Sequence, residues 1–318
     1  MEGDEAMTVW GWIAAGVGGL VVFPALLISF VIFCKLLVRA PFAKKKRRPC
    51  FPEEDEYMQM WAEAGAWRDR YADRRRDVSV TSGRLTLRGE YYDFGGDRAM
   101  MVLPGRTECC VYSAFFAEPY RKAGYNVLLT DSRGTGLSDG SLNCLGFREW
   151  RDVLRWADLL HGELGNREVF LHGVCIGCGT ALRVCTRPET PAWITGMAAE
   201  GMFRRFYDTT KNHMIDSGRP TFPALQVLMV WIRLFCGGSA AFDGPFRGIV
   251  KMRRPLLMLH SREDIFSVPE KAQELYDLCP SENKRMVWFD RGRHSRVRLN
   301  NPEAYDAAVI DFVGRDDG

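Results

Sequence analysis

A short glycine-rich stretch, Leu171-His172-Gly173-Val174-Cys175-Ile176-Gly177-Cys178-Gly179, contains residues that could do chemistry. Read as C-x-x-C, Cys175 and Cys178 have a spacing typical of thiol-disulfide exchange or metal binding. Read as G-x-C-x-G, the same residues form a sharp turn between a strand and a helix, which exposes one nucleophile. The two interpretations predict different proteins, and the rest of the chain must distinguish them.

The second interpretation gives each residue around Cys175 a physical role. A nucleophile on such a turn adopts strained backbone angles, and a side chain two residues before or after it would collide with neighbouring backbone. Gly173 and Gly177 occupy those two positions. A thiol at a helix N-terminus has its thiolate favoured by the helix dipole. The backbone N–H of Ile176 would then stabilise an oxyanion.

A thiol nucleophile needs a histidine base, and the base needs an orienting carboxylate. Among five histidines, His294 follows the last expected strand in a glycine-containing loop, which allows it to project over the sheet edge. Asp264 follows the penultimate expected strand and is the predicted orienting acid. Its neighbour Glu263 is a weaker candidate, and Glu200, after an earlier strand, is an alternative acid.

Strand and helix signals alternate along most of the chain, which predicts an α/β protein with a mostly parallel central sheet and helices on both faces. The expected strands are 78–81, 85–92, 99–103, 126–130, 168–172, 193–198, 255–260 and 285–290, and the expected helices are 147–164, 176–186, 224–236 and 302–313. At about 203–254 the alternation lapses. We interpret this stretch as a small lid-like insertion, with a peripheral helix and loop as the alternative.

The N-terminal part has a different character. Residues 1–8 form an acidic tail, and no charged residue occurs from Val9 to Cys34, which is long enough to cross a bilayer core of about 30 Å. We therefore predict one transmembrane helix at 9–38, with Trp10 and Trp12 at the membrane interface. A signal peptide is the alternative, but it fits poorly because the leading residues are acidic and the apolar stretch is long.

The basic run Lys44-Lys45-Lys46-Arg47-Arg48 follows the predicted span. The positive-inside rule then predicts a single-pass protein of the cell membrane, with its catalytic domain in the cytoplasm. The same run is expected to contact anionic lipid headgroups. Residues 39–77 are interpreted as a basic, then charged and helical linker, and residues 78–318 as the catalytic domain.

Four features together resemble the α/β-hydrolase superfamily, in particular its membrane-anchored bacterial branch similar to serine aminopeptidases and lipases. They are the turn at Cys175, the segment Asp131-Ser132-Arg133-Gly134-Thr135-Gly136-Leu137-Ser138-Asp139-Gly140, Asp264 and His294. The resemblance covers residues 78–313 and implies a Cys175–His294–Asp264 triad. It also implies an oxyanion site made of the backbone N–H groups of Ile176 and Arg106.

The chain departs from the family pattern at two places. The usual serine nucleophile is replaced by Cys175, as in dienelactone hydrolases and bile-acid acyltransferases. The usual His-Gly pair after the third strand is here Pro104-Gly105-Arg106.

The predicted function is hydrolysis of ester or thioester bonds through an acyl-enzyme. The substrate is expected to be a small molecule with an apolar acyl group, because the 224–236 helix in the insertion is rich in apolar residues. Alternatives are an acyltransferase, a catalytically altered family member, and a C-x-x-C redox-regulated thiol protein. No cofactor and no metal are expected, because neither a second C-x-x-C nor a histidine pair is present. A net charge of +3, from 43 basic and 40 acidic residues, argues against a nucleic-acid partner.

Overall fold

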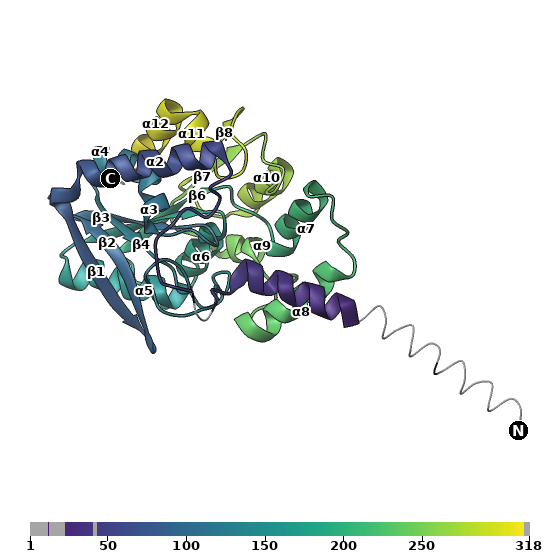
Figure 1. Ribbon diagram of the computed structural model, residues 1–318. Coiled ribbons are helices and arrows are strands. Elements are labelled where there is room, and N and C mark those ends of the chain that lie inside the picture. The colour runs from purple at the N-terminus through teal and green to yellow at the C-terminus, as the bar shows by residue number, and fades with distance from the viewer. Residues whose placement is uncertain (1–11, 13–22, 41–42, 315–318) are drawn as a thin grey trace, which may run out of the picture.

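The computed structural model describes residue 12, residues 23–40 and residues 43–314. Within these residues the chain forms an eight-stranded sheet of order β1-β2-β4-β3-β5-β6-β7-β8 (Figure 1). The strands are β1 (Arg75–Ser82), β2 (Leu85–Tyr92), β3 (Arg98–Leu103), β4 (Asn126–Thr130), β5 (Glu168–Val174), β6 (Ile194–Glu200), β7 (Leu256–Ser261) and β8 (Lys284–Phe289). β1, β2 and β4 pair antiparallel, and the pairs from β4 to β8 are parallel. The predicted mostly parallel sheet is confirmed.

The sheet is buried on both faces because its central strands are apolar throughout, and successive side chains point to opposite faces. In β3, Met100 and Val102 belong to one hydrophobic core, whereas Ala99, Met101 and Leu103 belong to the other. One face is covered by α2 (Asp55–Arg70), α3 (Cys110–Ser113), α4 (Glu118–Lys122), α11 (Val297–Asn300) and α12 (Pro302–Val313). The opposite face is covered by α5 (Trp150–Asp158), α6 (Ile176–Cys185) and α10 (Pro269–Leu278).

Helix α2 lies inside the segment that the sequence suggests is a linker. Its apolar residues Tyr57, Met60, Ala64 and Trp67 recur at helical spacing and are buried in the core on one sheet face. The strand after it, β1, begins at Arg75, three residues before the expected start at Val78. The charged segment is therefore a structural layer of the domain and does not merely connect it to the N-terminal region.

A helix at residues 23–37 packs against α8 (Ala224–Cys236), as Figure 1 shows for the purple helix beside α8. The Trp231 indole N–H donates to Ser29 Oγ at 3.1 Å, and the Phe30 and Trp231 rings meet edge to face at 5.2 Å. Phe33 and Leu37 are buried in the same apolar cluster. The last two turns of this helix therefore belong to the domain, although the prediction assigned them to a span.

None of the helices in the described residues has the combination of length and apolar character that a bilayer crossing requires. Of the transmembrane helix predicted at 9–38, residues 9–11 and 13–22 lie outside the described residues.

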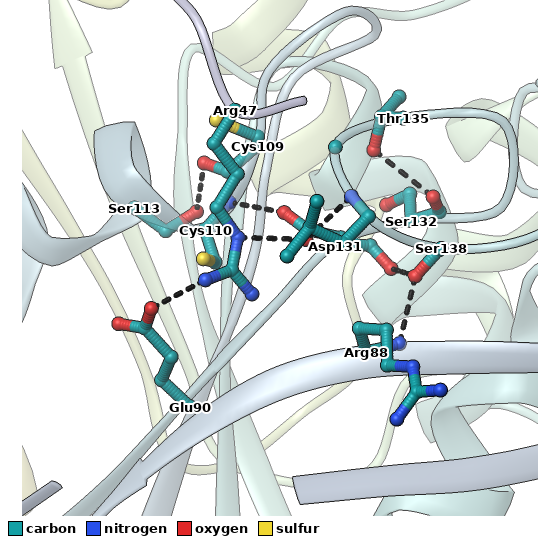
Figure 2. A network of polar contacts seen from close by, with 12 residues as sticks. Arg47, Arg88, Glu90, Cys109, Cys110, Ser113, Asp131, Ser132, Thr135 and Ser138 are labelled. Atoms are coloured by element: carbon teal, nitrogen blue, oxygen red, sulfur yellow. Dashed lines mark hydrogen bonds and ion pairs between the residues drawn. The ribbon is translucent and has the colours of Figure 1, made fainter. Parts of the chain in front are cut away.

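Part of the basic run is inserted into the domain through a network of ion pairs (Figure 2). Arg47 donates from Nε to Asp131 at 2.9 Å and from a terminal nitrogen to Glu90 at 2.5 Å. Glu90 also accepts two hydrogen bonds from Arg68 and one from the Tyr92 hydroxyl. The two carboxylates are almost fully buried, so Arg47 is a structural cation and is not available to lipid headgroups.

The same contacts attach the N-terminal segment to the glycine-rich loop after β4. Lys45 pairs with Asp139, and the Arg39 guanidinium donates to the carbonyl oxygens of Ser138 and Gly140 at 2.9 and 2.5 Å. The glycine-rich loop that contributes to the family resemblance is therefore held by residues that precede the predicted domain start at residue 78.

Replacing Arg47 with Gln should lower the free energy of unfolding by about 3 kcal/mol, because it leaves the buried Asp131 carboxylate without its cation and leaves Glu90 with Arg68 alone. Lys46→Gln, one residue earlier at an exposed position, is the matched control and should change it by less than about 0.5 kcal/mol. Urea unfolding followed by circular dichroism measures both. Equal stability of the two variants would contradict the assignment of Arg47.

Candidate active site

Cys175 lies on the turn between β5 and α6. β3 and β5 are neighbours in the sheet, and β4 lies on the other side of β3, so the chain changes direction across the sheet at this point. Its backbone has φ 53° and ψ −114°, a strained conformation for a residue with a side chain. A Cβ added at Gly173 would lie 2.5 Å from the Cys178 backbone nitrogen, and one at Gly177 would overlap the Leu103 carbonyl. Both glycines are thus required by close backbone approach, for the reason expected from the sequence.

The structure brings His294 and Asp264 together. His294 Nδ1 and Asp264 Oδ2 are 2.7 Å apart, and Asp264 Oδ1 accepts hydrogen bonds from the backbone N–H groups of Phe266 and Ser267 at 2.9 and 2.7 Å. The carboxylate is therefore fixed by the loop after β7 and holds one imidazole nitrogen. His294 Nε2 is buried and has no hydrogen-bond partner among the described residues, which leaves it for the proton of a neighbouring group.

Charge interactions between these residues set their protonation. Burial acts to lower the pKa of His294, but the Asp264 carboxylate and the Cys175 sulfur together raise that pKa well above its ordinary value. Burial acts to raise the pKa of Asp264, but His294 outweighs it and holds the pKa below the usual range. The electrostatics therefore favour an imidazolium beside the sulfur and an ionised carboxylate behind it.

Glu200, the alternative acid, does not contact His294 through a hydrogen bond. It ends β6, and its Oε2 accepts a 2.7 Å hydrogen bond from the Tyr305 hydroxyl of α12. Burial raises the pKa of Glu200 to about 7. Glu263, the weaker candidate, accepts a hydrogen bond from the backbone N–H of Gly292 at 2.9 Å. Asp264 is thus the acid that the geometry pairs with the histidine.

The loop after β3 lies beside the thiol. A Cβ on Gly105 would be 3.9 Å from the Cys175 Cβ, so Arg106 follows directly after a residue that approaches Cys175 closely. Asn143 Nδ2 donates to the Arg106 carbonyl at 3.0 Å, which fixes the peptide that follows. Ile176 begins α6 immediately after Cys175. The two residues expected to supply oxyanion N–H groups therefore both lie next to the sulfur.

A pocket of about 680 Å³ opens above Cys175 and His294, and several of its residues were not expected from the sequence. Glu108 accepts a 2.7 Å hydrogen bond from the hydroxyl of Tyr57, which α2 contributes, and burial raises the Glu108 pKa to about 7. His213, on α7 (Phe206–Asp216), stacks on Phe266 with ring centroids 3.5 Å apart. These contacts join distant segments and have no local motif that could have revealed them.

Cys178 lies one turn into α6 and is fully buried. Its thiol donates to the carbonyl oxygens of Gly173 and Glu200 at 3.1 and 3.2 Å, so it packs beneath the turn. Burial raises its pKa well above the ordinary value. All ten cysteines are free thiols, and among the described residues no group of three His, Cys, Asp or Glu side chains is placed to hold a metal.

Solved structures similar to this chain share its architecture. The Pyrococcus furiosus esterase Pf2001 superposes with a TM-score of 0.66 at 22% identity, over 79% of this chain and 94% of the esterase. MGS-M2, an α/β-hydrolase enzyme from a deep-sea metagenome library, superposes with a TM-score of 0.56 at 18% identity, over 76% of this chain and 98% of that enzyme. The chain has the α/β-hydrolase fold.

Sequence comparison finds relatives whose names state no activity. The uncharacterized protein YqkD of Bacillus subtilis (strain 168) is 24% identical over 67% of this chain and 70% of its own length. The uncharacterized membrane protein YNL320W of Saccharomyces cerevisiae is 25% identical over 61% of this chain and 62% of its own length. The chain matches no protein-family model. The fold is therefore shown by structure, and the activity must be argued from the site.

Gly177→Ala should destabilise the protein by about 3 kcal/mol or more, because its Cβ would overlap the Leu103 carbonyl and the sheet and helix must separate. Gly179→Ala is the control in the same helix. Its Cβ would lie 3.5 Å from Phe203, an ordinary contact, so the change should stay within about 1 kcal/mol. Thermal unfolding of both variants measures the difference, and a tolerated Gly177→Ala would refute the close approach.

Proposed function

We propose that this protein is a hydrolase of ester or thioester bonds that uses Cys175 as nucleophile, His294 as base and Asp264 as orienting acid. The observation that carries the proposal is the 2.7 Å contact between His294 and Asp264, with His294 Nε2 left without a hydrogen-bond partner among the described residues and with Cys175 lining the same pocket as His294. A nucleophile, a base and an orienting acid from three different loops are the parts required for acyl transfer.

In the first step the Cys175 thiolate, whose proton already resides on His294 Nε2 as an imidazolium, attacks the carbonyl carbon of the substrate. The carbonyl electron pair moves to its oxygen, where the backbone N–H groups of Ile176 and Arg106 stabilise the charge. The tetrahedral intermediate then collapses: the carbonyl re-forms, the bond to the leaving group breaks, and the leaving group takes the proton from His294. The acyl group remains on Cys175 as a thioester. In the second step, His294 accepts a proton from water, hydroxide attacks the thioester, and the acid and the Cys175 thiol are released.

The sulfur nucleophile limits the substrates. A thiolate leaves a tetrahedral intermediate more readily than an amide nitrogen does, so attack on an unactivated amide would mostly reverse. Esters and thioesters have better leaving groups and are the expected substrates. Cys175 also packs against an apolar cluster that includes Ile176, Phe203 and Leu228 of α8, which favours an apolar acyl group.

The thiol-disulfide alternative fits the geometry less well. Cys178 is fully buried and its thiol points to two backbone carbonyls, whereas a redox pair needs an accessible second sulfur.

Cys175→Ala and His294→Ala should each reduce kcat/KM on p-nitrophenyl esters and acyl thioesters by about 10³-fold or more, and Asp264→Asn by a similar factor. Cys178→Ala, the matched control in the same stretch, should keep activity within about threefold because a buried structural thiol is inert. Esterase and thioesterase assays of the purified full chain measure these effects. Equal loss in Cys178→Ala, together with disulfide reductase activity in the wild type, would contradict the proposal.

We also propose that the N-terminal region anchors the protein in the cell membrane, with the catalytic domain in the cytoplasm. Three observations support it. The uncharged stretch from Val9 leads into the helix at 23–37, which exposes Phe23, Leu27 and Ile28. Helix α8, packed against it, exposes Val230, Leu234 and Phe235. A yeast relative is named as a membrane protein.

Deleting residues 1–22 should move the protein from the membrane fraction to the soluble or weakly associated fraction, because it removes most of the uncharged stretch. Deleting only residues 1–8 is the control and should leave it in the membrane. A reporter enzyme that works only outside the cytoplasm, fused after Gly318, should be inactive. Activity of that reporter, or a membrane-bound 1–22 deletion after carbonate extraction, would contradict the proposed topology.

A further inference from the structure

A second cavity, of about 690 Å³, lies beside the catalytic pocket and is lined by positive charge. Its cationic side chains come from the N-terminal segment and the loop after β3: Lys35, Arg39, Lys44, Lys46, Arg48 and Arg106. No Asp or Glu is among the described residues that line it. The catalytic pocket, by contrast, mixes both signs and includes Glu54, Glu108 and Asp216. We call the first space the basic cavity.

The chain separates the basic run into two sets. Lys45 and Arg47 pair with carboxylates of the domain, namely Asp139, Asp131 and Glu90. Lys44, Lys46 and Arg48 instead line the basic cavity, and no ion pair to them occurs within the described residues. Residues 44, 46 and 48 thus face the cavity while residues 45 and 47 face the carboxylates, an alternation like that of side chains along a strand. The positive charge in the cavity is therefore built by the fold.

Arg106 joins the basic cavity to the catalytic pocket, because it lines both. Among the described residues its guanidinium makes one hydrogen bond, from a terminal nitrogen to the Leu36 carbonyl at 3.1 Å, and no ion pair. A guanidinium has five N–H donors, so most of them are available. Arg106 and Cys175 line the same pocket, so the cation lies near the thiol.

We propose that the basic cavity binds a phosphate group of the acyl substrate, on the leaving-group side of the bond that Cys175 attacks. Lys44, Lys46 and Arg48 are solvent-exposed cations with no carboxylate partner among the described residues, and Arg and Lys side chains are suited to phosphate oxygens. The inference rests on the proposed function and adds a substrate class to it: an acyl ester or thioester whose leaving group carries phosphate. That phosphate belongs either to a lipid headgroup or to a soluble acyl carrier.

The test compares two matched pairs of substrates with the full chain in neutral detergent. The lipid pair is lysophosphatidic acid and the monoacylglycerol of the same chain length. The soluble pair is an acyl coenzyme A and the N-acetylcysteamine thioester of the same acid. In at least one pair, the wild type should prefer the phosphate-bearing member by about tenfold or more in kcat/KM, since hydrogen bonds to charged groups are stronger than those between neutral groups. The pair that shows the preference identifies the source of the phosphate.

The variant Lys44→Gln/Lys46→Gln/Arg48→Gln should lose this preference and keep its activity on the neutral substrates. The control Arg70→Gln/Arg75→Gln/Arg84→Gln removes the same charge from exposed positions outside the cavity and should keep the preference. The proposal is overturned if the cavity variant retains the preference, or if the wild type hydrolyses these substrates and shows no preference in either pair. Weaker binding of the cavity variant to anionic vesicles, without a change in preference, also overturns it in favour of headgroup binding alone.

Equilibrium binding of inorganic pyrophosphate to Cys175→Ala protein separates this inference from the proposed function. We expect binding that weakens with salt and that becomes about tenfold weaker when the three cavity substitutions are added. That result supports the phosphate site even in a preparation that hydrolyses none of the four substrates, in which case the proposed hydrolase function is what fails. Equal pyrophosphate binding with and without the cavity substitutions overturns the phosphate site.

Discussion

The Asp131 carboxylate connects three segments that are far apart in the chain. It directly follows β4 and accepts hydrogen bonds from the backbone of Cys110 at the start of α3, from the backbone of Leu137 in the glycine-rich loop, and from the Arg47 side chain. Removing an unpaired, buried carboxylate from water is expensive, so these partners are effectively obligatory (Figure 2). Asp131 therefore helps to fix the N-terminal segment relative to the glycine-rich loop and α3.

The turn at Cys175 depends on a different constraint, which is close backbone approach. Gly173 and Gly177 let β5, α6 and the end of β3 come together without a Cβ between them. The strain at Cys175 is tolerated because the surrounding layers fix it, and the result is a sulfur held at the edge where the loops after β3, β7 and β8 converge. A rigid sheet thus presents a reactive group that its own loops surround.

Much of this architecture could be predicted from the sequence, because its signals are local. Apolar runs bounded by turn residues identified all eight strands, and helices 224–236 and 302–313 have the bounds expected from their periodicity. Asp264 and His294 were found because they follow strands whose ends meet at one edge. In contrast, the roles of Tyr57 and Glu108 depend on how α2 packs over the pocket. The two residues are 51 positions apart in the chain, so no local sequence pattern predicts their contact. Composition alone also suggested that the whole basic run faces lipid, whereas the partners of Arg47 lie 43 and 84 residues away.

The division of the basic run has a consequence for how it tolerates change. Because its side chains alternate between the domain and the cavity, the run has a register, much as a strand has. Inserting one neutral residue before Lys45 would keep the five basic residues and their charge. It would, however, direct the wrong set of cations toward Asp131 and Glu90. A five-residue stretch that looks like a simple charge cluster is therefore constrained in length and order, as a core element is.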